Sequence, residues 1–430
     1  MKKIISLLLI IFCVSPSFAV ESEDVLGLSI TDCLNIALTN HPSLKKSKGA
    51  TRAAEAMIEQ TKSTNRVKVN MTARTGLNGD YQYWDDRYHS GGLSITASKT
   101  LYDTNVNKLN IEIQKENLQG VLESERQTQI DVASNAKKAY YDLVLKILNR
   151  DVEREKLKNL ESHLTTARAI YEVGNSSYID VTKAEADVAT SRVSMLKAEN
   201  DILIAQEALK IAMGVSDLEN FDLVLSTNLF VPKAAGNIDD ILKIAMEDRA
   251  DYRKIQSTLR QRELEIKVAA RGNSPTITGS VGSDLSKRDG SSATRDYNAA
   301  VSVNIPIEDG GLTAAKIESA RAQLEQDKAE EESLRQNIAH DLRSAAFSLS
   351  NAIERAKSSE KSVQYAEENL ELAQGRYEVG VGDALEVSDA VSTLATSRYT
   401  LYQALYDAQT ARADLDSAMG HLPPEFEGRI

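Results

Sequence analysis

The chain has 430 residues, of which 42% are hydrophobic and only 5% aromatic, and its formal net charge is −12. An acidic chain of this kind is not expected to bind nucleic acid, which requires a positively charged surface. The low aromatic content, together with a stretch without proline between Pro42 and Pro232, favours long helices with narrow seams over one large globular core.

The first 19 residues have the pattern of a secretory signal peptide. Two lysines precede an apolar stretch at residues 4–14, and residues 17–19 form a small-residue cleavage site. The apolar stretch is too short for a spanning helix, which needs about 20 apolar residues. Cleavage would remove the two lysines and change the formal charge from −12 to −14. The mature chain would keep only Cys33, which excludes an intrachain disulfide, and no cysteine stands directly after the cleavage site to carry a lipid anchor.

The second half of the chain repeats the first. The segment Tyr171–Gly174 returns as Tyr377–Gly380, an offset of 206 residues (377 minus 171), and Ala189–Arg192 returns at the same offset as Ala395–Arg398. An offset this large is far beyond the period of a solenoid, so we expect two copies of one large unit. The predicted organisation is a first repeat at 20–214, a linker at 215–235, a second repeat at 236–420 and a tail at 421–430.

In each repeat, two short segments alternate between apolar and polar residues with the period of a strand. In the first segment, Val67, Val69, Met71 and Ala73 share one face. Ten such residues at ~3.3 Å each, tilted by about 45°, cover the ~25 Å apolar band of an outer-membrane barrel. A soluble sheet packed on a helix is the alternative, but no predicted helix is left to cover the apolar faces. The strands are expected at about 67–76, 92–100, 275–283 and 297–306.

Nearly all other segments have a helical pattern. The stretch from about Asn105 to Ala169 is expected to form one helix of roughly 100 Å, at 1.5 Å per residue. Apolar residues at heptad spacing predict that each long helix packs against a returning helix as a coiled coil, with Gly174 and Gly380 ending the long helices. The heptad positions of the second repeat are Leu342, Leu349, Ala356, Val363 and Leu370, followed by Val387, Leu394, Leu401, Ala408 and Leu415.

The predicted strands and helices together indicate a conduit. Four strands cannot close a barrel, and an open sheet edge cannot lie in lipid because its backbone groups would lack partners. Strands from several copies must therefore close one barrel, and the long helical pairs would continue it as a tube. The expected fold is mainly helical with a membrane β-barrel, built from two repeats of helix, strand, strand, long helix and returning helix.

The ends of the long helices resemble those of the TolC-like outer-membrane efflux and secretion channels. The most specific segments are Arg376–Gly380 followed by Leu385–Ala390, and Ala169–Gly174 followed by Tyr178–Val181. The resemblance covers essentially the whole mature chain. It implies a homotrimer with a twelve-stranded barrel in the lipid of the outer membrane and a helical tunnel across the periplasm. It also implies docking to a periplasmic adaptor and to an inner-membrane pump of the RND, ABC or MFS type, for efflux or type I secretion.

The same resemblance assigns roles at the periplasmic end of the tunnel. Glu386 and Asp389 would project into its constriction, where three copies of each would form acidic rings. Tyr377 and Asp180 match positions where the family forms latch contacts between neighbouring helices. Two departures stand out: Glu386 occupies a position where aspartate is usual, and Gly382 replaces a basic residue often found in the latch. The tips that an adaptor would grip are Val173, Gly174, Val379 and Gly380.

A purely structural interpretation competes for these residues. Asp383 with Glu386, and Ser177 with Asp180, have the spacing of a capping box, and the helix dipole favours carboxylates at a helix start. Capping does not explain Asp389. The tip glycines would, on this interpretation, only terminate helices.

Catalysis is not expected from this sequence. The five histidines are scattered without metal-ligand spacing, no nucleophile motif is present, and neither a cofactor nor a metal is expected. Two other functions remain as alternatives. A periplasmic adaptor would have one helical hairpin inserted in compact β domains, and a non-conducting surface coiled coil would leave the alternating strands unexplained.

Overall fold

The computed structural model describes residues 28–79, 87–174, 176–215, 229–234 and 236–423. The predicted signal peptide, most of the predicted linker and the end of the predicted tail lie outside these ranges. The first half contains α1 (Ile30–Asn40), α2 (Pro42–Ser63), β1 (Lys68–Asn78), β2 (Tyr88–Tyr102), α3 (Val106–Glu172) and α4 (Tyr178–Met213). The second half contains α5 (Ile238–Asp248), α6 (Ala250–Ala269), β3 (Thr276–Arg288), β4 (Thr294–Asn304), α7 (Leu312–Glu378) and α8 (Ala384–Ala418).

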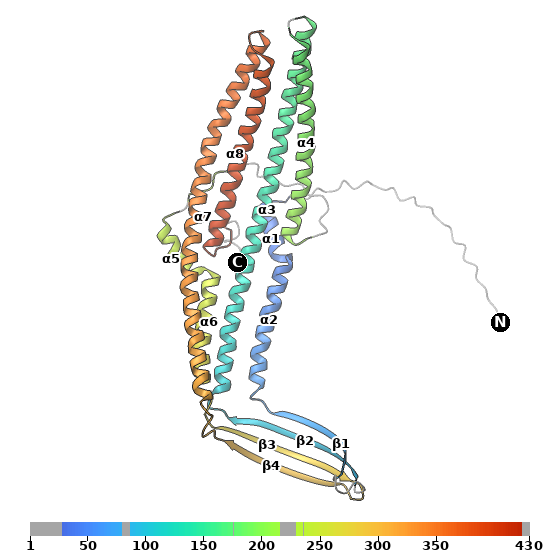
Figure 1. Cartoon of the computed structure of the whole chain (residues 1–430), viewed down its shortest axis with the longest axis vertical. Helices are drawn as coiled ribbons and strands as arrows, with labels where there is room; N and C mark the ends of the chain where they lie inside the picture. The colour runs from blue at the N-terminus through green and yellow to red at the C-terminus, as the bar shows by residue number, and fades with distance from the viewer. Residues whose placement is uncertain (1–27, 80–86, 175, 216–228, 235, 424–430) are drawn as a thin grey trace, which may run out of the picture.

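Two very long helices determine the shape of the molecule. α3 and α7 have 67 residues each and run from the sheet at one end to the helical tips at the other (Figure 1). At 1.5 Å per residue, each is roughly 100 Å long. α4 and α8, with 36 and 35 residues, return alongside the tip half, while α2 and α6 lie beside the sheet half. In the tip half the long helices form one layer in the order α7, α8, α3, α4.

The cores of the helical pairs are narrow seams, as the heptads predict. Leu342 and Leu349 of α7 are 1% and 0% exposed, and Val387 and Leu415 of α8 are 2% and 1% exposed. Alanine is common in these seams, so the helices approach closely.

The four strands form one antiparallel sheet in the order β1-β2-β3-β4. Val69, Ala97, Val281 and Ala299 lie opposite one another across it, and the next row, Asn70, Thr96, Gly282 and Asn298, is on the other face. The period-two patterns of the four strands are thus in phase. The apolar face is uncovered within the described residues, and Val69 and Val301 are 67% and 68% exposed.

The strands differ in length from the predicted ones for identifiable reasons. β2 and β3 extend further, to Tyr88 and Arg288, because their polar end residues continue the ladder beyond the apolar stretch that alternation detects. β4 ends at Asn304, short of the predicted 306. Pro306 lacks the backbone N–H that a further ladder bond would need.

Each returning helix ends against the start of a sheet-side helix. Gly214 follows α4 with φ of 71°, and a Cβ there would lie 2.5 Å from the His41 Cα. Gly420 follows α8, and its Cβ would lie 2.9 Å from the Arg249 Cα. Only glycine combines positive φ with so close a backbone approach. The returning helix and the sheet-side helix of each repeat are thereby stacked end to end beside the long helix.

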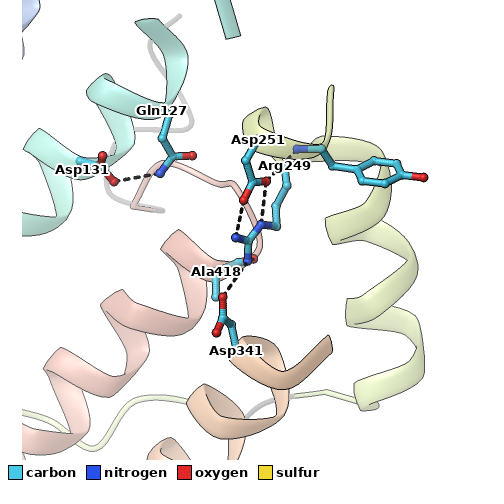
Figure 2. Close-up of polar contacts among 7 residues, drawn as sticks. Gln127, Asp131, Arg249, Asp251, Asp341 and Ala418 are labelled. Atoms are coloured by element: carbon cyan, nitrogen blue, oxygen red, sulfur yellow. Dashed lines mark hydrogen bonds and ion pairs between the residues drawn. The ribbon is translucent and has the colours of Figure 1, made fainter. Parts of the chain in front are cut away.

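In the second repeat this junction is fixed by an arginine. Arg249 donates from Nε and Nη2 to the two oxygens of Asp251, at 3.0 and 2.6 Å, and from Nη1 to the Ala418 carbonyl at 3.2 Å (Figure 2). Asp341 of α7 lies 3.7 Å from Nη1. One guanidinium therefore joins the α5–α6 corner to both α8 and α7.

Candidate functional site

The two tips at the end of the long helices expose apolar side chains. Val173 and Val379 are 72% and 73% exposed, and Ile179 at the start of α4 is 75% exposed. Gly174 and Gly380 adopt φ of 79° and 76° and donate to the carbonyls of Tyr171 and Tyr377 at 2.9 and 3.0 Å. The predicted adaptor-docking residues thus lie on exposed tips where each long helix ends in a hydrogen-bonded turn.

The turn of the second tip leaves little room for a side chain at Gly382. The Gly382 N–H donates to the Arg376 carbonyl at 2.9 Å, and a Cβ at Gly382 would lie 2.9 Å from the Tyr377 nitrogen. A longer side chain would require the turn to move. The missing basic residue at this position is therefore a consequence of the local backbone path.

Asp180 forms the predicted capping box. Its carboxylate accepts from the Ser177 N–H at 3.2 Å and from the Ser176 hydroxyl at 2.6 Å, while the Ser177 hydroxyl accepts from Ile179 at 3.3 Å. These bonds satisfy backbone donors that a helix start leaves unpaired. The Asp180 carboxylate therefore caps the start of its own helix, α4.

The capping box predicted for Glu386 is wrong. Asp383 does cap α8 by accepting from the Leu385 N–H at 3.1 Å, but Glu386 does not return to the cap residue. Its carboxylate instead lies 3.5 Å from Nε of Arg376, in the last turn of α7. A charged partner within reach replaces the capping bond. The exposed pair contributes about 0–1 kcal/mol to stability.

Asp389 is the other predicted aperture residue, and it is exposed one turn further along α8. Within the described ranges its carboxylate has no recorded hydrogen bond or ion pair; the Thr393 hydroxyl bonds only its backbone carbonyl, at 2.8 Å. Neither helix capping nor an ion pair therefore explains the carboxylate at position 389.

Tyr377 and Asp180, the predicted latch residues, approach each other within one chain without a hydrogen bond. Tyr377 is 7% exposed, and in the described part of the chain its buried hydroxyl has no hydrogen-bond partner. Burial raises the pKa of Tyr377, and the negative charges of Asp180 and Asp383 raise it further. The Tyr377 ring packs instead on His163, with centroids 5.0 Å apart.

His163 belongs to a buried polar joint that the sequence analysis missed. We define the joint as His163 of α3, Asp187 of α4, Tyr377 of α7 and Ser388 of α8, one residue from each long helix. The Ser388 hydroxyl donates to Asp187 at 2.6 Å across the two helical pairs, 201 residues apart in sequence. Scattered histidines gave no signal, because the joint exists only once the repeats are packed together.

Further polar contacts bind α8 to α3 nearer the middle of the molecule. The Tyr399 hydroxyl donates to Glu153 at 2.5 Å, and burial together with this bond raises the pKa of Tyr399. Arg398 pairs with Glu155 of α3 and with Glu367 of α7, the latter at 2.7 Å. α8 is therefore held on both sides.

The corresponding outer side of α4 has no such partner in the described chain. Its exposed apolar residues, between 61% and 75% exposed, are Ile179, Val193, Leu196, Leu203, Ile204 and Ile211. Among the helices that the structure describes, none is long and apolar enough to cross a bilayer. Nor do the described residues contain a cluster of three or more potential metal ligands.

An amphipathic sheet with an uncovered apolar face, continued at one end by two long helical pairs, defines a chain of a tunnel-shaped membrane channel. Residues 33–215 and 241–421 match the family described as outer membrane efflux protein. The chain belongs to this family. It is an outer-membrane efflux channel that extends into the periplasm, and it is not an enzyme.

Individual relatives are distant but cover most of the chain. Outer membrane protein TolC of Escherichia coli (strain K12) is 24% identical over 413 residues, 90% of this chain and 81% of that protein. Cation efflux system protein CusC of Escherichia coli (strain K12) is 21% identical over 391 residues, covering 89% and 84%. Crystal structures of CusC share the fold, with a TM-score of 0.79 at 20% identity over 92% of this chain and 93% of that one.

Proposed function

We propose that three copies of this chain form one conduit that gives passive exit to substrates delivered by an inner-membrane pump. The observation that carries the proposal is that the layer of long helices is open at both edges. In the tip half of the described chain, α7 at one edge of the layer and α4 at the other each have a neighbouring long helix on one side only. An open layer of helices and an open amphipathic sheet both require further copies.

The internal repeat indicates how the next copy is placed. α8 is seated between α7 and α3, and α4 is the repeat counterpart of α8. The counterpart of α3 is α7, so the outer side of α4 should meet α7 of a neighbouring copy. This contact joins two different surfaces, and such head-to-tail contacts close into rings.

An exposed aromatic on α7 supports this arrangement. Phe347 is 64% exposed, whereas Tyr141, its counterpart 206 residues earlier in α3, is 8% exposed in the core beside Leu405 and Tyr406 of α8. In the ring, Phe347 would pack against the α4 side of the next copy. An aromatic exposed in the single chain would thus be buried.

The sheet supports the same assembly from the membrane side. Its apolar face, including Met71 at 69% and Tyr297 at 73% exposed, suits contact with lipid. β1 and β4 are its edge strands, and only closure with strands of other copies would satisfy their backbone groups in a bilayer. Three copies of four strands would give twelve.

The opposite end is the proposed docking and gating region. Val173, Gly174, Val379 and Gly380 form exposed tips for a periplasmic adaptor, which would link the tunnel to an RND, ABC or MFS pump. Glu386 and Asp389 would line its mouth. Three unpaired Asp389 carboxylates, with Glu386 held by Arg376, would make this end attractive to cations.

Single-channel conductance in a planar bilayer tests the proposal. We expect small, cation-preferring currents that millimolar divalent cations block, and no block in the Glu386→Ala/Asp389→Ala variant. The matched control is Asp239→Ala/Asp240→Ala, which removes two exposed acids from α5. Block that persists in the aperture variant would return these acids to a structural role. No conductance from assembled protein would contradict the conduit and favour a structural coiled coil.

A further inference from the structure

The joint of His163, Asp187, Tyr377 and Ser388 fastens the two helical pairs of one chain near the tips. All four helices contribute, and three of the side chains, His163, Tyr377 and Ser388, are 6–8% exposed. The Ser388–Asp187 bond and the Tyr377–His163 ring contact both cross from one pair to the other. Separating the pairs would break both.

We propose that this joint is an acid-sensitive fastening, which holds the helical pairs together when His163 is neutral and loosens when His163 gains a proton. An imidazolium has two N–H donors and a charge, and a site this enclosed supplies little water to solvate either. A charge that cannot be solvated in place favours the arrangement in which the pairs separate. The proposal rests on the proposed tunnel only for its consequence, a wider periplasmic mouth.

Charged groups face the His163 ring from the helices packed against it. α4 presents Asp187, Asp180 and Lys183; α7 presents the neutral Tyr377; and α8 presents the Ala384 backbone, which hydrogen-bonds the ring, with Asp383 near Tyr377. The two nearest carboxylates already accept hydrogen bonds. Asp180 is bonded to Ser176 and Ser177, and Asp187 is bonded to Ser388.

Protonation therefore weakens the fastening, because it places the charge of an imidazolium in a buried seam. The Asp187 oxygen that Ser388 does not use can attract this charge, which offsets only part of the cost of burial. Burial lowers the pKa of His163 more than Asp187, Ala384 and Asp180 raise it. The joined state thus binds its proton less readily than an exposed histidine, and its stability falls as the pH drops below about 6.5.

The second seam of the proposed ring lacks this property. At the 206-residue offset, the counterparts of His163, Asp187, Tyr377 and Ser388 are Asn369, Thr393, Tyr171 and Thr182. None of these would change charge between pH 5 and 8. At these four positions, acid would act on the seam within each chain and not on the seam between copies.

The test is the distance between the two tips, measured by electron–electron double resonance. Spin labels are placed at the exposed Glu172 and Glu378 after substitution by cysteine, and labelled chains are diluted with unlabelled ones so that each reports its own tips. Burial raises the pKa of Cys33 to about 12, which keeps this thiol unreactive towards the label.

We expect one narrow distance at pH 7.5 and a second, longer population at pH 5, with a midpoint below 6.5. His163→Asn, which installs the residue of the other repeat, should keep the narrow distance at both pH values. His340→Asn, at an exposed position of α7, should respond like the parent. An unchanged parent distribution, or the same acid response in His163→Asn, would overturn the proposal.

The pH midpoint of the parent protein and its conductance complete the test. Should His163→Asn fail to assemble, the pH midpoint of the distance change in the parent protein still tests the proposal. A midpoint near pH 4 would indicate titration of carboxylates and would overturn the role of His163. Conductance recorded on the same protein separates the two proposals. A pH-dependent distance without conductance would contradict only the conduit, and conductance with an invariant distance would contradict only the joint.

Discussion

α4 and α8 are counterparts in an internal repeat, yet their surroundings differ. Tyr399 of α8 is seated on α3 through its bond to Glu153, whereas Val193, its counterpart in α4, is 68% exposed. Both helices pack on their own long helix in the same way. The difference lies on the other side, where α8 lies against α3 and α4 has no further long helix beside it in the described part of the chain.

This difference shows what the duplication accomplishes. A repeat that provides two similar units can place one unit's contact inside the chain and leave the other for the next copy. The contact inside the chain carries polar groups specific to it, including Glu153, Glu155, Asp187 and His163. The contact left open carries mainly apolar side chains on α4. The two seams are therefore similar in shape and different in chemistry.

The largest effect is expected from a charge on the open side of α4. Val193→Arg would place a cation among the apolar side chains of α4, against α7 of the next copy. Burying an unpaired charge costs several kcal/mol per contact, so we expect loss of the oligomer in native mass spectrometry. The control is Thr190→Arg, at a position that is exposed in both repeats. An intact oligomer in Val193→Arg would contradict the proposed seam.

A smaller effect is expected at the junctions where helices meet end to end. Arg249→Ala removes charge-assisted bonds to Asp251 and Ala418 from a side chain that is 15% exposed. We expect a loss of about 3 kcal/mol in the free energy of unfolding, measured by denaturant titration of the helical circular dichroism. His41, its counterpart in the first repeat, only caps α2 by accepting from Ser43 at 3.2 Å. His41→Ala should cost about 1 kcal/mol. Equal losses of stability in the Arg249→Ala and His41→Ala variants would contradict the difference between the two junctions.

A third comparison concerns the bond that crosses the joint. Ser388→Ala removes the donor to Asp187 and should destabilise the protein by about 1.5 kcal/mol at pH 7.5. Its counterpart Thr182 is exposed and bonds only the Tyr178 carbonyl of its own helix, at 3.0 Å. Thr182→Ala should therefore change stability by less than about 0.5 kcal/mol. Thermal unfolding of both variants at the same pH gives the contrast.

The smallest effect on stability is expected from Glu386. Its ion pair with Arg376 is half exposed on both sides, so Glu386→Gln should cost about 0.5 kcal/mol or less. Denaturant titration with and without 0.5 M salt, roughly three times the physiological ionic strength, checks this. A loss above about 2 kcal/mol would assign Glu386 a mainly structural role.

Much of the fold could be predicted from the sequence because its signals are local and repeated. The heptads of α7 and α8 and the period-two alternation of the strands can be recognised within short segments. Each pattern also occurs at the corresponding place in the other repeat, which supports the prediction. Strand ends were less predictable, since the polar ends of β2 and β3 do not alternate. The capping of Asp180 followed from its spacing, while Glu386 found a charged partner that spacing alone could not reveal.

The joint could not be predicted for a different reason. His163, Asp187, Tyr377 and Ser388 come from four helices, and only the packing of one repeat on the other brings them together. The clue that was available lay in comparing the repeats. His163 stands where the other copy has Asn369, and Ser388 and Asp187 stand where it has threonines, so the repeats diverge where the chain contacts itself.

The central claim is that α4 of one copy lies against α7 of the next. Cysteines at Ala189 and Ser358 test it directly, because their counterparts Ala395 and Val152 line one small cavity between α8 and α3. Within one chain these positions lie on helices at opposite ends of the layer (Figure 1). Oxidation of the assembled protein should yield covalent dimers and trimers of the chain, with none from either single cysteine. A chain that stays monomeric after oxidation, although assembled, would contradict the claim.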